Sequence, residues 1–155
     1  MLLLLLLLLP PLVVIACGQL SLFNGKAPTD LGVRDGMLKA PGPDSVNVVS
    51  SYAARQVHTA YNEIEPIRFS GNAATAFDKL KSIIGAMDGA TIIKSEPMYV
   101  YAQYRTPLMK FIDDVEFVLD APNQVIHMRS ASRIGRSDLG ANRKRLELIR
   151  SRFNS

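Results

Sequence analysis

Residues 113–150 read DDVEFVLDAPNQVIHMRSASRIGRSDLGANRKRLELIR. Within this stretch, apolar and polar side chains alternate from Asp114 to Asp120 and again from Val125 to Arg133, which predicts two β-strands. Pro122 and Asn123, which lie between the two runs, are residues typical of turns. We therefore expect an antiparallel hairpin in which the two strands lie side by side.

The predicted turn sets the register of this hairpin. On one face Glu116 stands opposite Arg129, and Val118 stands opposite His127. The same register assembles an apolar face on the other side, where Val115, Phe117 and Leu119 meet Ser130, Met128 and Ile126, respectively. We expect the Glu116–Arg129 pair to face solvent, where such a pair contributes only about 0.2–1 kcal/mol.

The end of the stretch predicts a helix that begins near Asp138. Residues three and four positions apart form a stripe that we expect to pack on the sheet: Leu139, Asn142, Leu146, Ile149 and Phe153. Gly135 and Gly140 precede this helix and allow the backbone to turn.

Upstream of the hairpin, the pattern predicts a strand and then a helix. Ile64–Phe69 is typical of a short strand, with Pro66 placing it at a sheet edge or a strand start. Residues 73–87 carry apolar side chains every three or four positions, which predicts an amphipathic helix. Asn72 is its expected N-cap, and Gly89 follows its end.

Two further strands, Thr91–Ser95 and Met98–Arg105, complete the predicted order of strand, helix, four strands and helix. This order indicates an α+β fold in which a curved antiparallel β-sheet wraps a long helix. With the helices on one face, we expect the other face of the sheet to be open to solvent, a membrane or a ligand.

Polar residues and glycines, with one isoleucine, recur at fixed intervals near the end of the chain. The positions are Arg129, Ser130, Ser132, Arg133, Gly135, Asp138, Gly140, Asn142, Arg143, Arg145, Glu147, Ile149 and Arg150. With the strand DDVEF, they resemble the family catalogued as domain of unknown function 1499, whose block reads RSxSRxGxxDxGxNRxRxExIR. The resemblance implies no particular activity. The family's CPxSPNCVSS-like segment has two cysteines that correspond here to Gly42 and Val48, so their role, disulfide or metal, is absent.

The first 16 residues form an apolar segment without charge. Pro10 and Pro11 interrupt the run, which is shorter than the roughly 20 residues of a membrane-spanning helix and typical of a signal peptide. Because Ala16 and Cys17 resemble the end of a lipobox, we expect cleavage and lipidation at Cys17. The protein would then be exported and lipid-anchored to a bacterial membrane, facing the periplasm or the cell exterior. The alternative is an uncleaved leader with a buried or accidental cysteine, because no positive residue follows Met1.

Glycines and prolines without a sustained period fill residues 17–43, which predicts a tether and an irregular lead-in. Residues 44–155 then predict a single α+β domain. At its start, Asn47, Ser50 and Ser51 have short polar side chains that we expect to hold a loop. Cys17 is the only cysteine, so an internal disulfide is excluded.

Basic residues gather in residues 129–152. They are Arg129, Arg133, Arg136, Arg143, Lys144, Arg145, Arg150 and Arg152. Asp138 and Glu147 are the only acidic residues in this range. The whole chain has a formal net charge of only +4, so the positive charge is concentrated here. Such a patch suggests nucleic acid or an anionic surface. For an exported lipoprotein we expect phospholipid headgroups or a lipid-like ligand, and no nucleic acid.

Five residues of this region form a candidate anion-binding site: Ser130, Ser132, Arg133, Arg143 and Arg145. Cations near a helix start oppose the helix dipole, so this cluster indicates negative charge nearby. The charge belongs either to a bound carboxylate or phosphate or to the protein itself. The candidate internal ion-pair network comprises Asp113, Asp114, Glu116, Arg129 and Asp138. We favour the internal network, because buried arginines are usually satisfied by protein groups.

Asp114 and Glu116 also suggest an alternative function, because they share a strand face about 7 Å apart, within the range of inverting glycosidases. Asp113 points to the opposite face. We expect neither a metal site nor a cofactor, since His58 and His127 lack a metal-binding spacing and no phosphate or dinucleotide motif is present.

The sequence therefore favours a non-enzymatic envelope lipoprotein that binds an anionic or amphipathic small molecule or a partner protein. The alternatives are a hydrolase that uses Asp114 and Glu116 and a purely structural accessory protein of the envelope.

Overall fold

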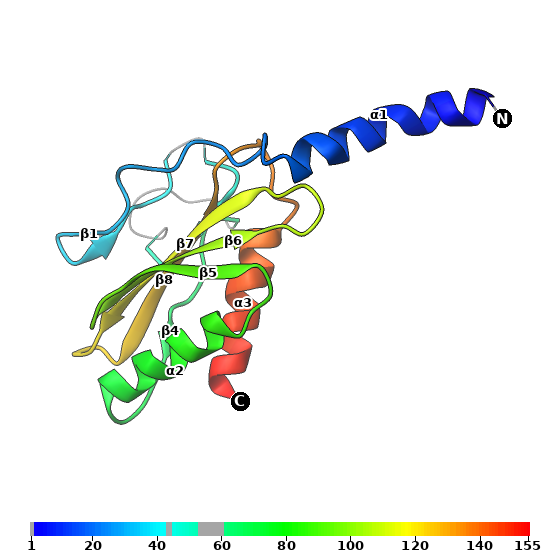
Figure 1. Ribbon diagram of the computed structural model, residues 1–155. Coiled ribbons are helices and arrows are strands. Elements are labelled where there is room, and N and C mark those ends of the chain that lie inside the picture. The colour runs from blue at the N-terminus through cyan, green and yellow to red at the C-terminus, as the bar shows by residue number, and fades with distance from the viewer. Residues whose placement is uncertain (1, 43–44, 53–60) are drawn as a thin grey trace.

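The computed structural model describes residues 2–42, 45–52 and 61–155 (Figure 1). The helices are α1 (Leu2–Gln19), α2 (Ala73–Gly85) and α3 (Ala141–Asn154). The strands are β1 (Val33–Arg34), β2 (Met37–Leu38), β3 (Val48–Ser50), β4 (Ile67–Arg68), β5 (Ala90–Ser95), β6 (Tyr99–Arg105), β7 (Ile112–Asp120) and β8 (Val125–Ser132). His58 and Asp44, the expected first residue of the domain, lie outside the described residues.

One antiparallel sheet forms the centre of the molecule, with the strand order β3-β8-β7-β6-β5. β4 also pairs with β8, while β1 and β2 form a separate hairpin. The four consecutive strands β5 to β8 confirm the predicted meander. The α+β class is confirmed as well, because α2 and α3 lie on one side of an open sheet (Figure 1).

The predicted register of β7 and β8 is confirmed. Glu116 faces Arg129, and Phe117 faces Met128. Phe117 and Met128 have no exposed surface and belong to the main core, which lies between the sheet and the two helices. The alternation of residue types therefore determined both the pairing and the face that packs inward.

α2 matches its prediction closely. The Asn72 side chain accepts a hydrogen bond of 3.0 Å from the backbone N–H of Thr75, as expected of an N-cap. Phe77, Leu80 and Ile84 are buried against the sheet. Their spacing of three and four residues places them on one face of the helix.

The predicted start of the last helix was wrong. α3 begins at Ala141, because Leu139 and Gly140 both adopt positive φ, which interrupts a right-handed helix. Leu139 is therefore 88% exposed and does not belong to the stripe that packs on the sheet. The remaining residues of that stripe are buried.

The segment before α2 differs from its prediction. The predicted strand Ile64–Phe69 is reduced to Ile67–Arg68, although Ile64 is buried in the core. Val48–Ser50, expected within a loop, form β3 and pair with β8. Ser51 was expected to hold a local loop, but its Oγ accepts a hydrogen bond of 3.0 Å from the N–H of Met128 in β8, 77 positions away.

Residues 18–42, which we call the lead-in, lie on the sheet face opposite the helices (Figure 1). Leu38 of β2 is 3% exposed and packs in a second cluster with Tyr52, Tyr99 and Val118. The expectation that this face is open was therefore wrong for its centre. A Cβ added at Gly25 would lie 2.8 Å from the Arg133 side chain, so the lead-in packs closely there.

α1 extends away from the rest of the molecule (Figure 1). Its last residue, Gln19, donates a hydrogen bond of 2.7 Å to the carbonyl of Leu108, in the turn between β6 and β7. In the part of the chain that the structure describes, no helix has both the length and the apolar character needed to cross a membrane.

Candidate functional site

Strand β7 carries three acidic residues whose side chains each meet an arginine. Asp114 accepts two hydrogen bonds from Arg133, of 2.9 Å from Nε and 2.8 Å from Nη2. The Tyr101 hydroxyl donates a third, at 2.5 Å. The hydrogen bond to Asp114 raises the pKa of Arg133, while burial and the bond to Asp114 raise the pKa of Tyr101. Asp114 is thus a fully bonded carboxylate that is only 1% exposed.

Glu116 lies on the same face and is completely buried. Its Oε1 accepts hydrogen bonds from the backbone N–H of Gly32, at 2.7 Å, and from the Tyr99 hydroxyl, at 2.8 Å. Its Oε2 accepts one bond of 3.1 Å from Arg129. Burial and the negative charge of Glu116 raise the pKa of Tyr99, which keeps that hydroxyl protonated as a donor. The expectation that Glu116 and Arg129 form an exposed pair was wrong, because the lead-in covers them.

Asp113 points toward the helices, as the alternation predicts. It forms an ion pair of 2.5 Å with Arg145 of α3, which also donates bonds of 2.9 Å to Ser130 and Asn142. Asn142 has no exposed surface, and its Nδ2 donates to Ser132 Oγ at 3.0 Å. The two serines are thus partners of α3, and Asn142 joins the helix to β8.

Asp138 and Arg143 stabilise the region where α3 begins. Asp138 accepts a hydrogen bond of 2.8 Å from the N–H of Asn142 and another from the Tyr61 hydroxyl. Burial raises the pKa of Asp138, but these hydrogen bonds outweigh burial, so the pKa is lowered. Arg143 donates to the carbonyls of Tyr61 and Glu63. Both side chains therefore act within the protein.

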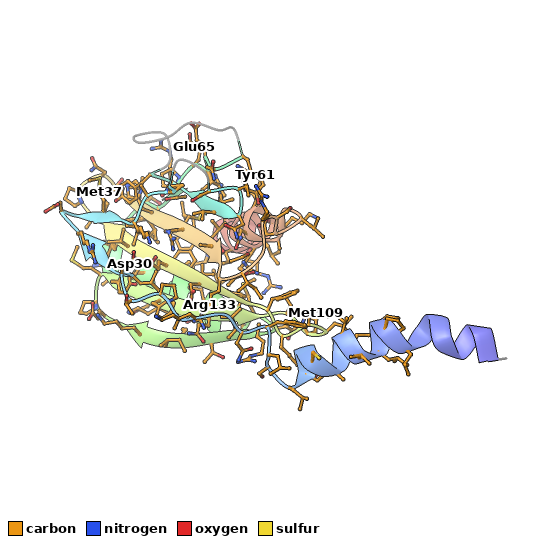
Figure 2. All side chains as sticks on the ribbon, turned by 90° about the horizontal axis from the view of Figure 1, so that it is seen from above. Asp30, Met37, Tyr61, Glu65, Met109 and Arg133 are labelled. Carbon is orange, nitrogen blue, oxygen red and sulfur yellow. The ribbon has the colours of Figure 1, made fainter. Side chains whose placement is uncertain are left out.

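The five residues of the candidate anion-binding site do not converge on one place. Ser130, Ser132 and Arg145 lie on the helix side of the sheet, whereas Arg133 bonds Asp114 on the opposite side. Figure 2 shows Arg133 apart from Tyr61, the residue whose carbonyl Arg143 contacts. The ion-pair residues form three separate pairs, and Asp138 takes a capping role.

Sequence reasoning missed the tyrosines and the lead-in as partners of the acids. Tyr99 and Tyr101 are two positions apart in β6 and so share one face of the strand, and Tyr101 stands directly opposite Glu116. Extending the predicted register by one strand would therefore have found both tyrosines. The hydrogen bond from Gly32 comes from its backbone N–H, which every residue except proline has, so the residue type at position 32 could not predict it.

We call the sheet face that carries Asp114 and Glu116 the ion-pair face. A groove of about 810 Å³ lies beside it, at the end of the sheet that carries the β5–β6 and β7–β8 turns. Its lining is mainly apolar and includes Val33, Pro97, Met98, Val118 and Leu119. Its polar residues are Tyr52, Tyr99 and two acids, Glu96 and Asp120.

The groove wall is held in place by Tyr52. Its hydroxyl donates a hydrogen bond of 3.2 Å to the carbonyl of Gly36 in the β1–β2 hairpin. Its ring stacks on the His127 ring, with the two centroids 4.1 Å apart. Binding sites for small molecules usually have this character, with an apolar lining, a few polar groups and a volume of roughly 300–1,000 Å³.

The buried carboxylates are poorly placed for catalysis. A general acid or base must come within hydrogen-bond reach of substrate, yet Asp114 and Glu116 are surrounded by protein donors. Among the described residues, no group of three or more His, Cys, Asp or Glu side chains is arranged to hold a metal ion.

Comparison with protein families matches residues 40–153 to the family described as "Protein of unknown function (DUF1499)". Comparison with curated proteins and with solved structures gives no match. The matched residues include strands β3 to β8, and they span well over half of the chain. The chain therefore belongs to the DUF1499 family of proteins of unknown function.

Proposed function

We propose that this protein is a non-enzymatic binding module of the bacterial envelope and that its groove binds a small amphipathic molecule. The observation that carries the proposal is the apolar groove of about 810 Å³. Met98 and Val33, which line it, are 52% and 41% exposed, so apolar surface is accessible to a ligand. Burying such surface is the main source of affinity for apolar molecules.

The charges at the groove restrict its occupant. Glu96 and Asp120 are acidic, and among the described residues no basic side chain lines the groove. Lys94 pairs with Glu96 at 2.7 Å, which neutralises one of these acids. A ligand with an apolar body and a neutral or cationic polar end fits this lining, whereas an anionic end would meet like charge.

Titration with the neutral fluorescent probe N-phenyl-1-naphthylamine tests the groove. We expect saturable binding by the wild-type protein, and we expect Met98→Glu to weaken it at least about tenfold, because the variant places a charge in the apolar lining. Leu148→Glu is the matched control, since Leu148 is 44% exposed and lies outside the groove. Absence of saturable binding, or equal weakening by both variants, would contradict the proposal.

The hydrolase alternative has little support from this geometry. Its carboxylates, Asp114 and Glu116, do not line the groove, and three protein donors bond each of them. The purely structural alternative predicts that the groove has no ligand, so the probe titration also separates that alternative from binding.

We also propose that Cys17 is lipidated and holds the protein at a membrane. The apolar run that ends at Ala16 supports this proposal, as does the partial exposure of Cys17. The domain would lie close to the bilayer, because the chain packs on the β6–β7 turn from Gly18 onward. The exposed side chains Leu20 and Leu108 lie near this point.

Metabolic labelling with an alkyne fatty acid tests the lipid anchor. We expect the wild-type protein to become labelled and Cys17→Ser to lose the label and to leave the membrane fraction. Continued labelling of Cys17→Ser would contradict lipidation at this residue. Loss of the label with retention in the membrane would indicate an uncleaved leader.

A further inference from the structure

A second cavity, of about 320 Å³, lies between the lead-in and the ion-pair face; we call it the basic chamber. Basic side chains reach it from both sides: Lys26 and Lys39 from the lead-in, and Arg129 and Arg133 from the end of β8. Its volume is that of about ten molecules of liquid water. Figure 2 shows Arg133 on the side of the sheet along which the lead-in runs past Asp30.

Arg129 has hydrogen-bonding capacity that the protein leaves unused. Its side chain is 7% exposed, and its one hydrogen bond among the described residues goes from Nη1 to Glu116. Its buried Nε has no partner there. A guanidinium has five N–H donors, and a buried donor that forms no hydrogen bond is destabilising. Arg133 differs, because its Nε and Nη2 both bond Asp114.

The protein acceptors near Arg129 are already engaged. Glu116 accepts from Gly32 and Tyr99 in addition to Arg129. Asp114 is bonded to Arg133 and Tyr101. The unused donors of Arg129 are therefore available to an acceptor from outside the protein.

The charges of the chamber leave a positive excess. Asp114 pairs with Arg133, Glu116 with Arg129, and Asp30 with Lys39. The bond from Lys39 lowers the pKa of Asp30, as the positive charge of Arg129 also does to a smaller extent. Lys26 forms no ion pair within the described part of the chain, so the described charged groups of the chamber carry one positive charge in excess.

We infer that the basic chamber binds a small oxyanion, of the size and charge of a phosphate group. The anion accepts hydrogen bonds from the unused N–H groups of Arg129, whose planar fork matches the geometry of oxyanions. Lys26 supplies the compensating charge. This site is separate from the apolar groove and does not depend on the function proposed for it.

Isothermal titration calorimetry with inorganic phosphate, on the purified full chain, tests the chamber. We expect Arg129→Lys to weaken binding at least about tenfold. Lysine keeps the positive charge opposite Glu116 but lacks the planar guanidinium and its Nε–H donor. Lys26→Gln is expected to weaken binding about threefold, as the loss of an exposed charge would. Lys144→Gln, which removes an equal charge from the exposed side of α3, is expected to leave binding unchanged.

A second measurement separates the two sources of a phosphate group. Sedimentation with vesicles of phosphatidylcholine and phosphatidylglycerol detects a headgroup ligand, and inorganic phosphate detects a free one. Binding of either probe that Arg129→Lys weakens supports the chamber and identifies its source. If Arg129→Lys does not fold, a loss in Lys26→Gln without a loss in Lys144→Gln serves instead. Absence of binding to both probes, or binding that no chamber variant weakens, would overturn the inference.

Discussion

Replacing Arg145 with methionine is expected to lower the free energy of unfolding by about 3–5 kcal/mol. Arg145 forms the ion pair with Asp113, whose residue is 3% exposed, so the substitution leaves a carboxylate buried beside α3 without its cation. The variant also loses the bonds to Ser130 and Asn142 and the stacking of the guanidinium over the Tyr104 ring. Urea unfolding followed by circular dichroism measures the loss.

Two variants make this result specific. Glu147→Gln removes the partner of Arg150 on the same helix, where Glu147 is 49% exposed, and is expected to cost no more than about 1 kcal/mol. The double variant Asp113→Leu with Arg145→Met removes both charges and is expected to recover much of the loss, because no buried charge remains. An Arg145→Met loss as small as that of Glu147→Gln would contradict the structural role of this pair.

The same experiment bears on the candidate anion site predicted from sequence. The donors of Arg145 are directed at Asp113, Ser130 and Asn142. A large loss of stability therefore follows from contacts within the protein and needs no ligand. Of the three arginines predicted to bind an anion, only Arg133 lines the basic chamber, and Asp114 already engages it.

The pairing of β7 with β8, and the face of this hairpin that packs on the helices, could be predicted from sequence because apolar and polar residues alternate along both strands. In β7 and β8, most residues of one face are apolar, and the turn at Pro122 fixes the pairing. For α2 the period of three and four and the Asn72 cap gave both the helix and its inward face. These signals are local, so neighbouring residues suffice to recognise them.

The cover on the opposite face could not be predicted, because its contacts are distant and partly backbone. The lead-in has no period, and it is held by bonds such as Gly32 N–H to Glu116, whose residues lie 84 positions apart. The close approach of Gly25 to Arg133 similarly depends on a missing side chain. Without this cover, Glu116 and Arg129 were expected to be exposed, and the chamber could not be recognised.

The residues of the candidate anion-binding site are divided between two faces of the sheet for a reason that the sequence itself contains. Ser130 and Ser132 have even positions in a strand, whereas Arg133 has an odd one, so alternation separates them to opposite faces. Arg129 shares the face of Arg133 and was assigned to the ion-pair network alone. Strict use of alternation would have placed Arg129 and Arg133 together and the serines with α3.

Replacing Phe117 with alanine is expected to lower the free energy of unfolding by about 3–5 kcal/mol. Phe117 lies at the centre of β7, has no exposed surface and stands opposite Met128, which is equally buried. Since β8 and β6 flank it in the sheet and the main core packs on its face, the neighbouring residues have little freedom to fill the cavity.

The matched control for this prediction is Leu139→Ala. Leu139 was predicted to belong to the core stripe, but it is 88% exposed, so its truncation is expected to change stability by no more than about 0.5 kcal/mol. Urea unfolding of both variants, with an unchanged dependence on denaturant, compares the two effects directly. A loss of several kcal/mol in Leu139→Ala would contradict the helix start at Ala141. A loss in Phe117→Ala as small as that expected of Leu139→Ala would contradict the inward face of β7. A large difference requires that the hairpin register, and not hydrophobicity alone, decides which residues form the core.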